Sequence, residues 1–110
     1  MSWGIQYAPL AEEDLLKAYR HIAYFLRAPE NAAEQTMRII RAVRSLEEMP
    51  QRHRLYDDEP WHSQGLRVMP VDNYIILYWL DTRQKTVHIA RIMYGRMNVS
   101  SQLDTVSIPQ

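Results

Sequence analysis

The feature that most constrains the fold is a near-continuous apolar run at residues 74–80 of this 110-residue chain. The run is far shorter than the roughly 20 residues that a membrane-spanning helix needs, and it suits a central strand of a sheet. Residues 81–84 are typical of a turn, and residues 86–93 return as another strand. Residues 66–71 form a strand before the run, and Pro70 predicts an edge position or a bulge there. The C-terminal half therefore predicts a three-stranded meander.

The N-terminal half predicts one strand and two helices. Large apolar residues alternate with small or polar ones over residues 3–7, which favours a short strand. Pro9 can open a helix, because a proline in the first turn loses no needed N–H, and an apolar face continues to about residue 27. After a break at Pro29, Asn31 and a glutamate three residues later resemble a capping box. The second amphipathic helix runs from there to about residue 48.

The element order is β-α-α-β-β-β, with residues 51–64 expected as a loop or an irregular strand. We expect an α+β fold in which a helix hairpin covers one face of a small, mainly antiparallel sheet. A short helix is expected at 99–103, followed by a flexible tail from about residue 104. The length fits one domain, residues 1–110, and 46% hydrophobic with 24% charged residues is an ordinary globular composition.

Charge and composition exclude several classes of protein. Thirteen basic residues balance thirteen acidic ones, so the basic excess of a dedicated nucleic-acid binder is missing. Without cysteine there is no disulfide scaffold and no thiolate site, and four histidines without tight spacing predict no metal site. No cofactor is implied, and no helix-turn-helix is visible, so we expect no sequence-specific DNA binding. A signal peptide is not evident at the start, which predicts a cytoplasmic protein.

Two stretches in the C-terminal half carry a family resemblance. Residues 66–78 read Leu-Arg-Val-Met-Pro-Val-Asp-Asn-Tyr-Ile-Ile-Leu-Tyr, and residues 87–96 read Val-His-Ile-Ala-Arg-Ile-Met-Tyr-Gly-Arg. Together with the element order, they resemble the RelE/ParE superfamily of toxins from type II toxin–antitoxin systems. The resemblance implies growth inhibition and neutralisation by a cognate antitoxin protein. It also implies one of two targets: the ribosome with its mRNA, which RelE-like members cut without a metal, or DNA gyrase, which ParE-like members stall.

RNA cleavage without a metal needs a general base, a proton donor and a fixed positive charge on the phosphate. If the chain is a nuclease, the candidate catalytic residues are Arg67, Tyr94 and Arg96. In many RelE-like nucleases an arginine follows the tyrosine that opens the central strand, but here Ile75 follows Tyr74. Further candidates for a role in RNA cleavage are Arg54 and the three histidines His53, His62 and His88.

These departures favour the ParE-like alternative, inhibition of DNA gyrase. A RelE-like endoribonuclease with a rearranged site stays open, as does an inactive relic that only binds its antitoxin. Each candidate residue also has a structural alternative: Arg67 and Arg91 suit exposed strand positions with cross-strand partners, and His88 suits the more polar face of the sheet.

Three arginines recur along the second helix as candidate partner contacts. Arg38, Arg41 and Arg44 lie beside its apolar stripe, where they can bind an acidic partner segment or gyrase, or can instead pair with glutamates of the same helix. Tyr78 is a further candidate partner contact, with packing in the sheet as its alternative. Because one hairpin covers only one face, we also expect an uncovered apolar face on the sheet, which would accept an antitoxin helix or strand.

Overall fold

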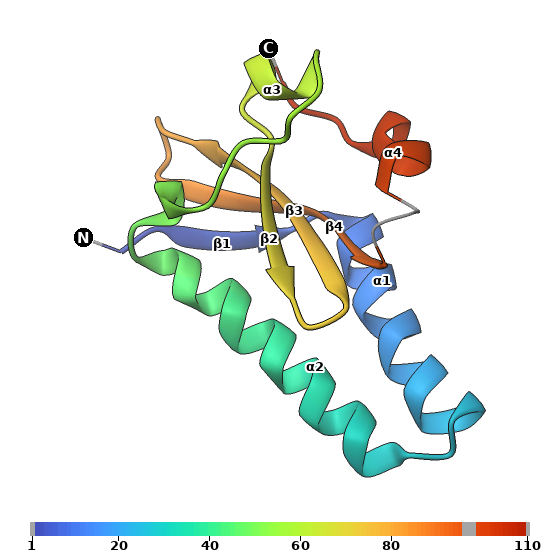
Figure 1. Ribbon diagram of the computed structural model, residues 1–110. Helices are drawn as coiled ribbons and strands as arrows, with labels where there is room; N and C mark the ends of the chain where they lie inside the picture. Colours follow the sequence, from blue (N-terminus) through green and yellow to red (C-terminus); the bar gives the residue numbers. More distant parts are fainter. Residues whose placement is uncertain (1, 96–98, 110) are drawn as a thin grey trace.

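The computed structural model describes residues 2–95 and 99–109 of the chain and has the predicted α+β architecture (Figure 1). A four-stranded sheet packs against a helix hairpin, and short helices connect and follow the strands. The elements are β1 Gly4–Tyr7, α1 Pro9–Arg20, α2 Pro29–Arg44, α3 Trp61–Gln64, β2 Arg67–Val71, β3 Tyr74–Asp81, β4 Thr86–Tyr94 and α4 Val99–Gln102.

The strands lie in the order β1-β4-β3-β2. The three C-terminal strands form the predicted antiparallel meander, and β1 joins it parallel to β4 through the crossover of the hairpin. Pro70 lies in β2, at the edge of the sheet, where a residue without an N–H loses no ladder hydrogen bond on its outer side.

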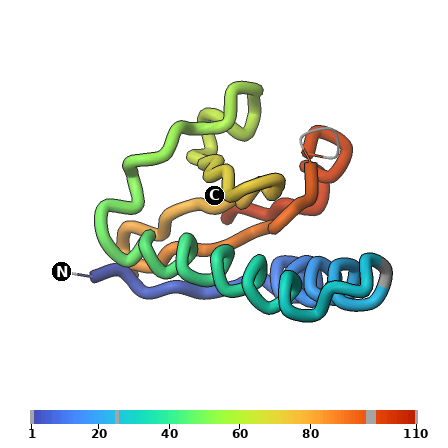
Figure 2. The backbone as a smooth tube through the Cα atoms, turned by 60° about the horizontal axis from the view of Figure 1, so that its bottom comes forward, coloured from blue at the N-terminus to red at the C-terminus, as the bar shows by residue number. Residues whose placement is uncertain are grey.

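The hairpin of α1 and α2 covers one face of the sheet as a separate layer, and its far end extends beyond the strands (Figures 1 and 2). Ile39 and Val43 of α2 and Leu46 after it are fully buried against the sheet. They meet Ile76 and Ile89, which point to the same face of β3 and β4. The periodicity of the two helices predicts apolar faces that this core contains only in part. Leu15, Val43 and Leu46 lie in it, whereas Leu26 and Met37 are exposed.

The opposite face of the sheet is covered by the chain itself, so the expectation of an uncovered apolar face was wrong. Short segments from two places in the sequence pack there, around α3 and around α4 (Figures 1 and 2). Val99, Leu103 and Val106 are buried in this second core against Leu77 and Met93 of the sheet. Burial does not measure mobility, and the flexible tail stays a prediction.

Both helices of the hairpin differ from the prediction at their ends. After Arg20 the chain continues as a single π-helical segment, His21–Phe25. The second helix begins at Pro29 with Ala28 as its N-cap, and the cap makes no side-chain hydrogen bond. The capping box at Asn31 was therefore wrong, because the proline that seemed to interrupt the helix is its first residue. The region expected as a loop or irregular strand contains the short helix α3 and the 3-10 turn Pro50–Arg52.

Candidate functional site

Arg67 and Tyr78 are neighbours in the sheet, and both hold the same loop. They lie opposite each other in the register of β2 and β3. The Arg67 guanidinium donates to the carbonyls of Gln51, at 3.1 Å, and His53, at 2.8 Å. The Tyr78 hydroxyl donates to the carbonyl of Pro50 at 2.6 Å. The two side chains therefore fasten residues 50–53 to the sheet.

Tyr78 is fully buried, so it has no surface to offer a partner protein in this structure. Burial raises the pKa of its hydroxyl to about 12, against the lowering effect of Arg67 and Arg52 nearby. The hydroxyl is a neutral donor at physiological pH. His53 meets the Tyr78 ring edge-on at a centroid distance of 6.4 Å, and burial, with the charge of Arg52, lowers the pKa of its imidazole.

Tyr94 lies at the other end of the long strands. It ends β4, and its half-exposed ring meets Tyr74 in a T-shaped contact at 5.3 Å. In the register, Tyr94 is opposite Tyr74 and Arg67 is opposite Tyr78. The two rows are four residues apart on β3, which is about 13 Å along the strand. The structure thus separates Arg67 from Tyr94, and Arg96 lies outside the described residues.

Ile75 lies in a groove of about 430 Å³ on the second face of the sheet. Arg54, Asp57 and Asp58 line the same groove. Arg54 already pairs with Asp57 at 3.3 Å, so the lining of the groove holds one more carboxylate, Asp58, than cations. A site with this balance of charge repels a phosphate group instead of holding it.

Arg91 is a buried ion-pair residue, so the expectation of an exposed strand position was wrong. Its Nε and second terminal nitrogen donate to the two carboxylate oxygens of Asp14 on α1, at 2.7 and 2.9 Å. The same carboxylate accepts the backbone N–H of Ile92 at 2.9 Å. Arg91 also donates to the Thr105 hydroxyl at 2.7 Å. Asp14 raises the pKa of Arg91 through this hydrogen-bonded pairing, which keeps the guanidinium charged.

The sequence reasoning missed this pairing. The register of β3 and β4 shifts between Leu77 and Tyr78, so that Leu77 faces Arg91 while Tyr78 faces Ile89. Such a bulge re-aims the side chains that follow it. Asp14 lies 77 positions before Arg91 in the chain, and no local pattern joins the two residues.

All three predicted partner contacts on α2 are exposed, and they differ in their ion pairs. Arg38 pairs instead with Asp72 in the turn between β2 and β3, at 2.9 Å, and Gln35 donates to the same carboxylate oxygen. Arg41 and Arg44 make no ion pair among the described residues, so the expected pairing with glutamates of their own helix is not formed. The surface therefore keeps two unmatched cations on one side of α2.

The remaining histidine candidates have structural contacts. His88 stacks flat on Trp79, with centroids 4.2 Å apart and planes at 9°, and a ring nitrogen of His62 lies 2.9 Å from the carbonyl of Tyr56. Within the described ranges, no three histidine or carboxylate side chains gather into a possible metal site. Among the same residues, no helix has the length and apolar character to cross a membrane.

Comparison with known proteins gives one family and two informative folds. The sequence model described as "ParE toxin of type II toxin-antitoxin system, parDE" matches residues 5–99. The chromosomal ParDE system from P. aeruginosa has a similar structure, with a TM-score of 0.70 and 20% identity over 86% of this chain and 98% of that one. The toxin–antitoxin complex RelBE2 from Mycobacterium tuberculosis is similar with a TM-score of 0.62 and 20% identity, over 86% and 92%. At this identity the two structures show the fold, and the comparison with curated sequences gives no match.

Proposed function

This chain belongs to the ParE toxin family of type II toxin–antitoxin systems, and we propose that it arrests growth by inhibiting DNA gyrase. We also propose that a cognate antitoxin protein neutralises it. The observation that carries the choice of gyrase over mRNA is the separation of the groups that RNA cleavage would require.

Cleavage of RNA without a metal needs a base, a proton donor and a cation around one phosphate. Arg67 is occupied by the carbonyls of Gln51 and His53, and Tyr94 stands about 13 Å away along the strands. Tyr78, the tyrosine nearest to Arg67 in the register, is buried and keeps its proton. Within the described residues these candidates do not meet at one point on the surface.

The position beside Tyr74 supports the same choice. RelE-like nucleases often carry an arginine there, and this chain has Ile75, which is buried in the second core. The groove next to it holds Asp57 and Asp58 with a single arginine. Both features disfavour the binding of a phosphate group in this groove. Inhibition of gyrase does not require a phosphate-binding groove.

The proposal of an antitoxin partner is supported by the similar structures, because one is a ParDE toxin–antitoxin system and the other is a RelBE2 toxin–antitoxin complex.

The test is induction of the chain alone in growing bacteria, followed by two measurements on the arrested cells. A reporter of the DNA-damage response detects stalled gyrase, and primer extension on abundant mRNAs detects cleavage. We expect growth arrest, a strong damage response and intact mRNA. Cuts at codons in translated mRNA without a damage response would instead assign the RelE-like activity.

A variant pair sharpens the result. Arg67→Ala removes a candidate catalytic cation, and Arg83→Ala removes an exposed arginine in the turn after β3. We expect both variants to arrest growth at equal protein levels. Loss of toxicity in Arg67→Ala alone, with normal folding, would contradict the proposal, and growth without arrest in the unaltered chain would mark it as an inactive relic.

A further inference from the structure

The helix hairpin carries most of the exposed large apolar side chains of the described residues, with Leu16 and Met37 on its outward side and Leu26 beside Tyr74 and Tyr94 of the sheet. Among the described residues, seven large apolar side chains are exposed, and five of them lie on the hairpin: Leu10, Leu16, Tyr24, Leu26 and Met37. An open groove of about 570 Å³ runs between α1 and α2, lined mainly by Leu15, Leu16, Tyr19, Thr36 and Ile40. A contiguous apolar surface of this kind typically marks an interaction site.

The charges on this side follow the same order along each helix. On α1, Glu12, Leu16 and Arg20 are spaced by four and share one stripe. On α2, Glu30 is followed by Met37, and then by Arg41 and Arg44, on another stripe. Each stripe therefore runs from acidic through apolar to basic in the direction of the chain.

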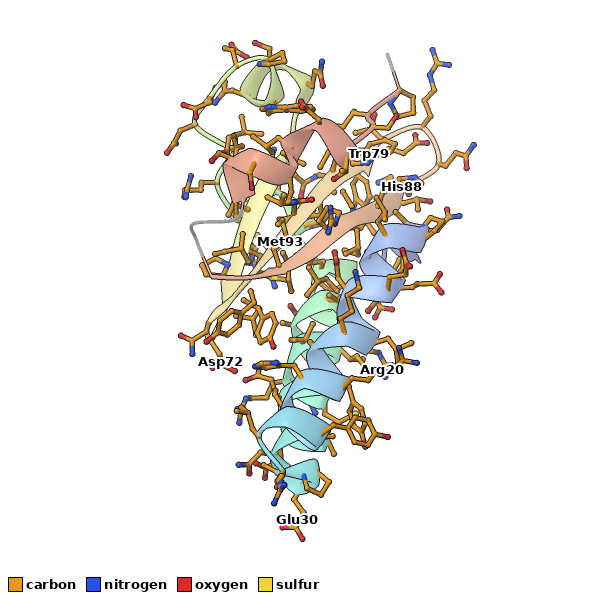
Figure 3. All side chains as sticks on the ribbon, turned by 90° about the vertical axis from the view of Figure 1, so that its right-hand side faces the viewer. Arg20, Glu30, Asp72, Trp79, His88 and Met93 are labelled. Carbon is orange, nitrogen blue, oxygen red and sulfur yellow. The ribbon has the colours of Figure 1, made fainter. Side chains whose placement is uncertain are left out.

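The two helices of the hairpin are antiparallel neighbours, so the stripes run in opposite directions. Glu12 and Tyr19 of α1 line the same groove as Thr36 and Ile40 of α2. The acidic start of α1 consequently lies at the level of the basic end of α2. Figure 3 shows Arg20 part of the way along the hairpin and Glu30 at its far end.

We propose that this outward face binds a second copy of the same chain, with α1 of each copy packed on α2 of the other. A two-fold axis along the hairpin places Glu12 opposite the partner's Arg44 and Leu16 opposite the partner's Met37. It also brings the basic end of each α1 toward the acidic start of the partner's α2. Such an interface uses one patch on both copies and must be self-complementary, and this alternation of charge meets that condition.

The charge pattern favours a second copy over a uniformly acidic segment. An acidic helix laid along the face would meet Arg41 and Arg44, but it would also meet Glu12 and Glu30, at a cost in repulsion. The ion pairs among the described residues join Arg38 to Asp72, Arg54 to Asp57 and Arg91 to Asp14. The charged residues of the outward face are thus left for partners outside the chain. This inference concerns self-association and does not depend on gyrase as the target.

The test uses charge reversal in the full chain, made by cell-free synthesis to avoid toxicity. Sedimentation equilibrium gives the mass of the unaltered chain, of Glu12→Arg, of Arg44→Glu and of an equimolar mixture of the two variants. We expect the unaltered chain to be a dimer. For each variant alone, the dissociation constant of the dimer should rise at least about tenfold, because every dimer contains the altered contact twice. The mixture should dimerise again, because each variant supplies the charge that the other lacks.

The control is Arg83→Glu, which reverses an exposed charge in the turn after β3 and should leave the dimer intact. Circular dichroism confirms that all variants are folded. The proposal would be overturned if the unaltered chain stayed monomeric at a concentration 100-fold above 1 μM. It would also be overturned if the mixture of the two variants stayed monomeric. If Arg44→Glu weakened binding of an antitoxin to a chain that is always monomeric, the face would belong to the antitoxin and the proposal would fail.

Discussion

The two faces of the sheet are buried in different ways. On one face, side chains of two long amphipathic helices pack against the sheet. Ile39, Val43 and Leu46 are fully buried there. On the other face, the cover consists of α3, α4 and the segment that follows, each with one or two anchoring side chains. The first core is made of regular elements with repeated contacts, whereas the second depends on single residues such as Leu103 and Val106.

The difference predicts which part of this small fold is most stable and which part opens locally. Helices with a stripe of buried residues lose many contacts together when they detach, and short segments lose few. We therefore expect the helix-covered face to unfold with the whole domain and the second face to open more readily. Arg91 connects the two, because it holds Asp14 of α1 on one side and Thr105 of the second cover on the other.

The largest expected effect comes from breaking this connection. Asp14→Ala removes the partner of a buried guanidinium and an acceptor of the Ile92 N–H, and loss of one partner of a buried pair costs roughly 3–5 kcal/mol. Urea denaturation should show this loss of unfolding free energy. Glu13→Ala, on the neighbouring exposed residue, should change stability by less than about 0.5 kcal/mol. Equal effects in the two variants would disprove the central role of the pair.

The next effect tests the helix-covered face. Ile39→Ala creates a cavity at a position with no exposure, and truncation of a buried isoleucine costs about 3–4 kcal/mol because the surrounding helices and strands cannot close the space. The midpoint of urea unfolding should fall accordingly. Met37→Ala on the exposed side of the same helix is the matched control and should be nearly neutral for the unfolding of the monomer.

The amphipathic helices and the strands were predictable because their signals repeat within the sequence. The apolar run at 74–80 and the stripes of the two helices each contain several residues that agree with one another. The second cover has no such repeat: Trp61, Val99 and Val106 are isolated apolar residues in short segments, and their positions depend on the sheet that they pack against. Sequence reasoning therefore predicted the layer of helices and left the opposite face bare.

The candidate site was predictable in its residue types and not in their roles. Arg67 and Tyr78 were identified as candidates, but they bind backbone carbonyls of residues 50–53. Contacts to backbone carbonyls leave no side-chain motif in the sequence, so these roles could not be predicted. Arg91 was assigned to an exposed position because charged strand residues are seldom buried, whereas Asp14 of α1, far away in the chain, pairs with its guanidinium.

A smaller effect is expected on the second face. Leu103→Ala should cost about 2 kcal/mol, near the lower end for buried leucines, because short neighbouring segments can move toward the cavity. Native-state hydrogen exchange should show faster exchange in residues 99–106 with little change in α2. If the variant accelerated exchange equally in both, the two faces would form one cooperative unit, and the contrast between them would be wrong.

The smallest effect at neutral pH should come from Tyr78→Phe, at about 1–2 kcal/mol for the lost hydrogen bond to Pro50. Its pH dependence is more informative. The folded state raises the pKa of Tyr78 to about 12 from 10.0, so the neutral hydroxyl stabilises the fold fully below pH 10, and this contribution is lost as the pH rises through 12. The unaltered protein should lose stability over that range more steeply than Tyr78→Phe. Parallel curves for the two proteins would contradict the buried position of the hydroxyl.

The most direct test of the proposed activity is the supercoiling of relaxed plasmid DNA by purified gyrase in the presence of increasing amounts of this chain. A parallel reaction contains ribosomes programmed with mRNA and the same amounts of the chain. We predict that supercoiling is inhibited in proportion to the chain added while the ribosome-bound mRNA stays intact. Unimpaired supercoiling together with cleavage of the mRNA at codons would contradict the account.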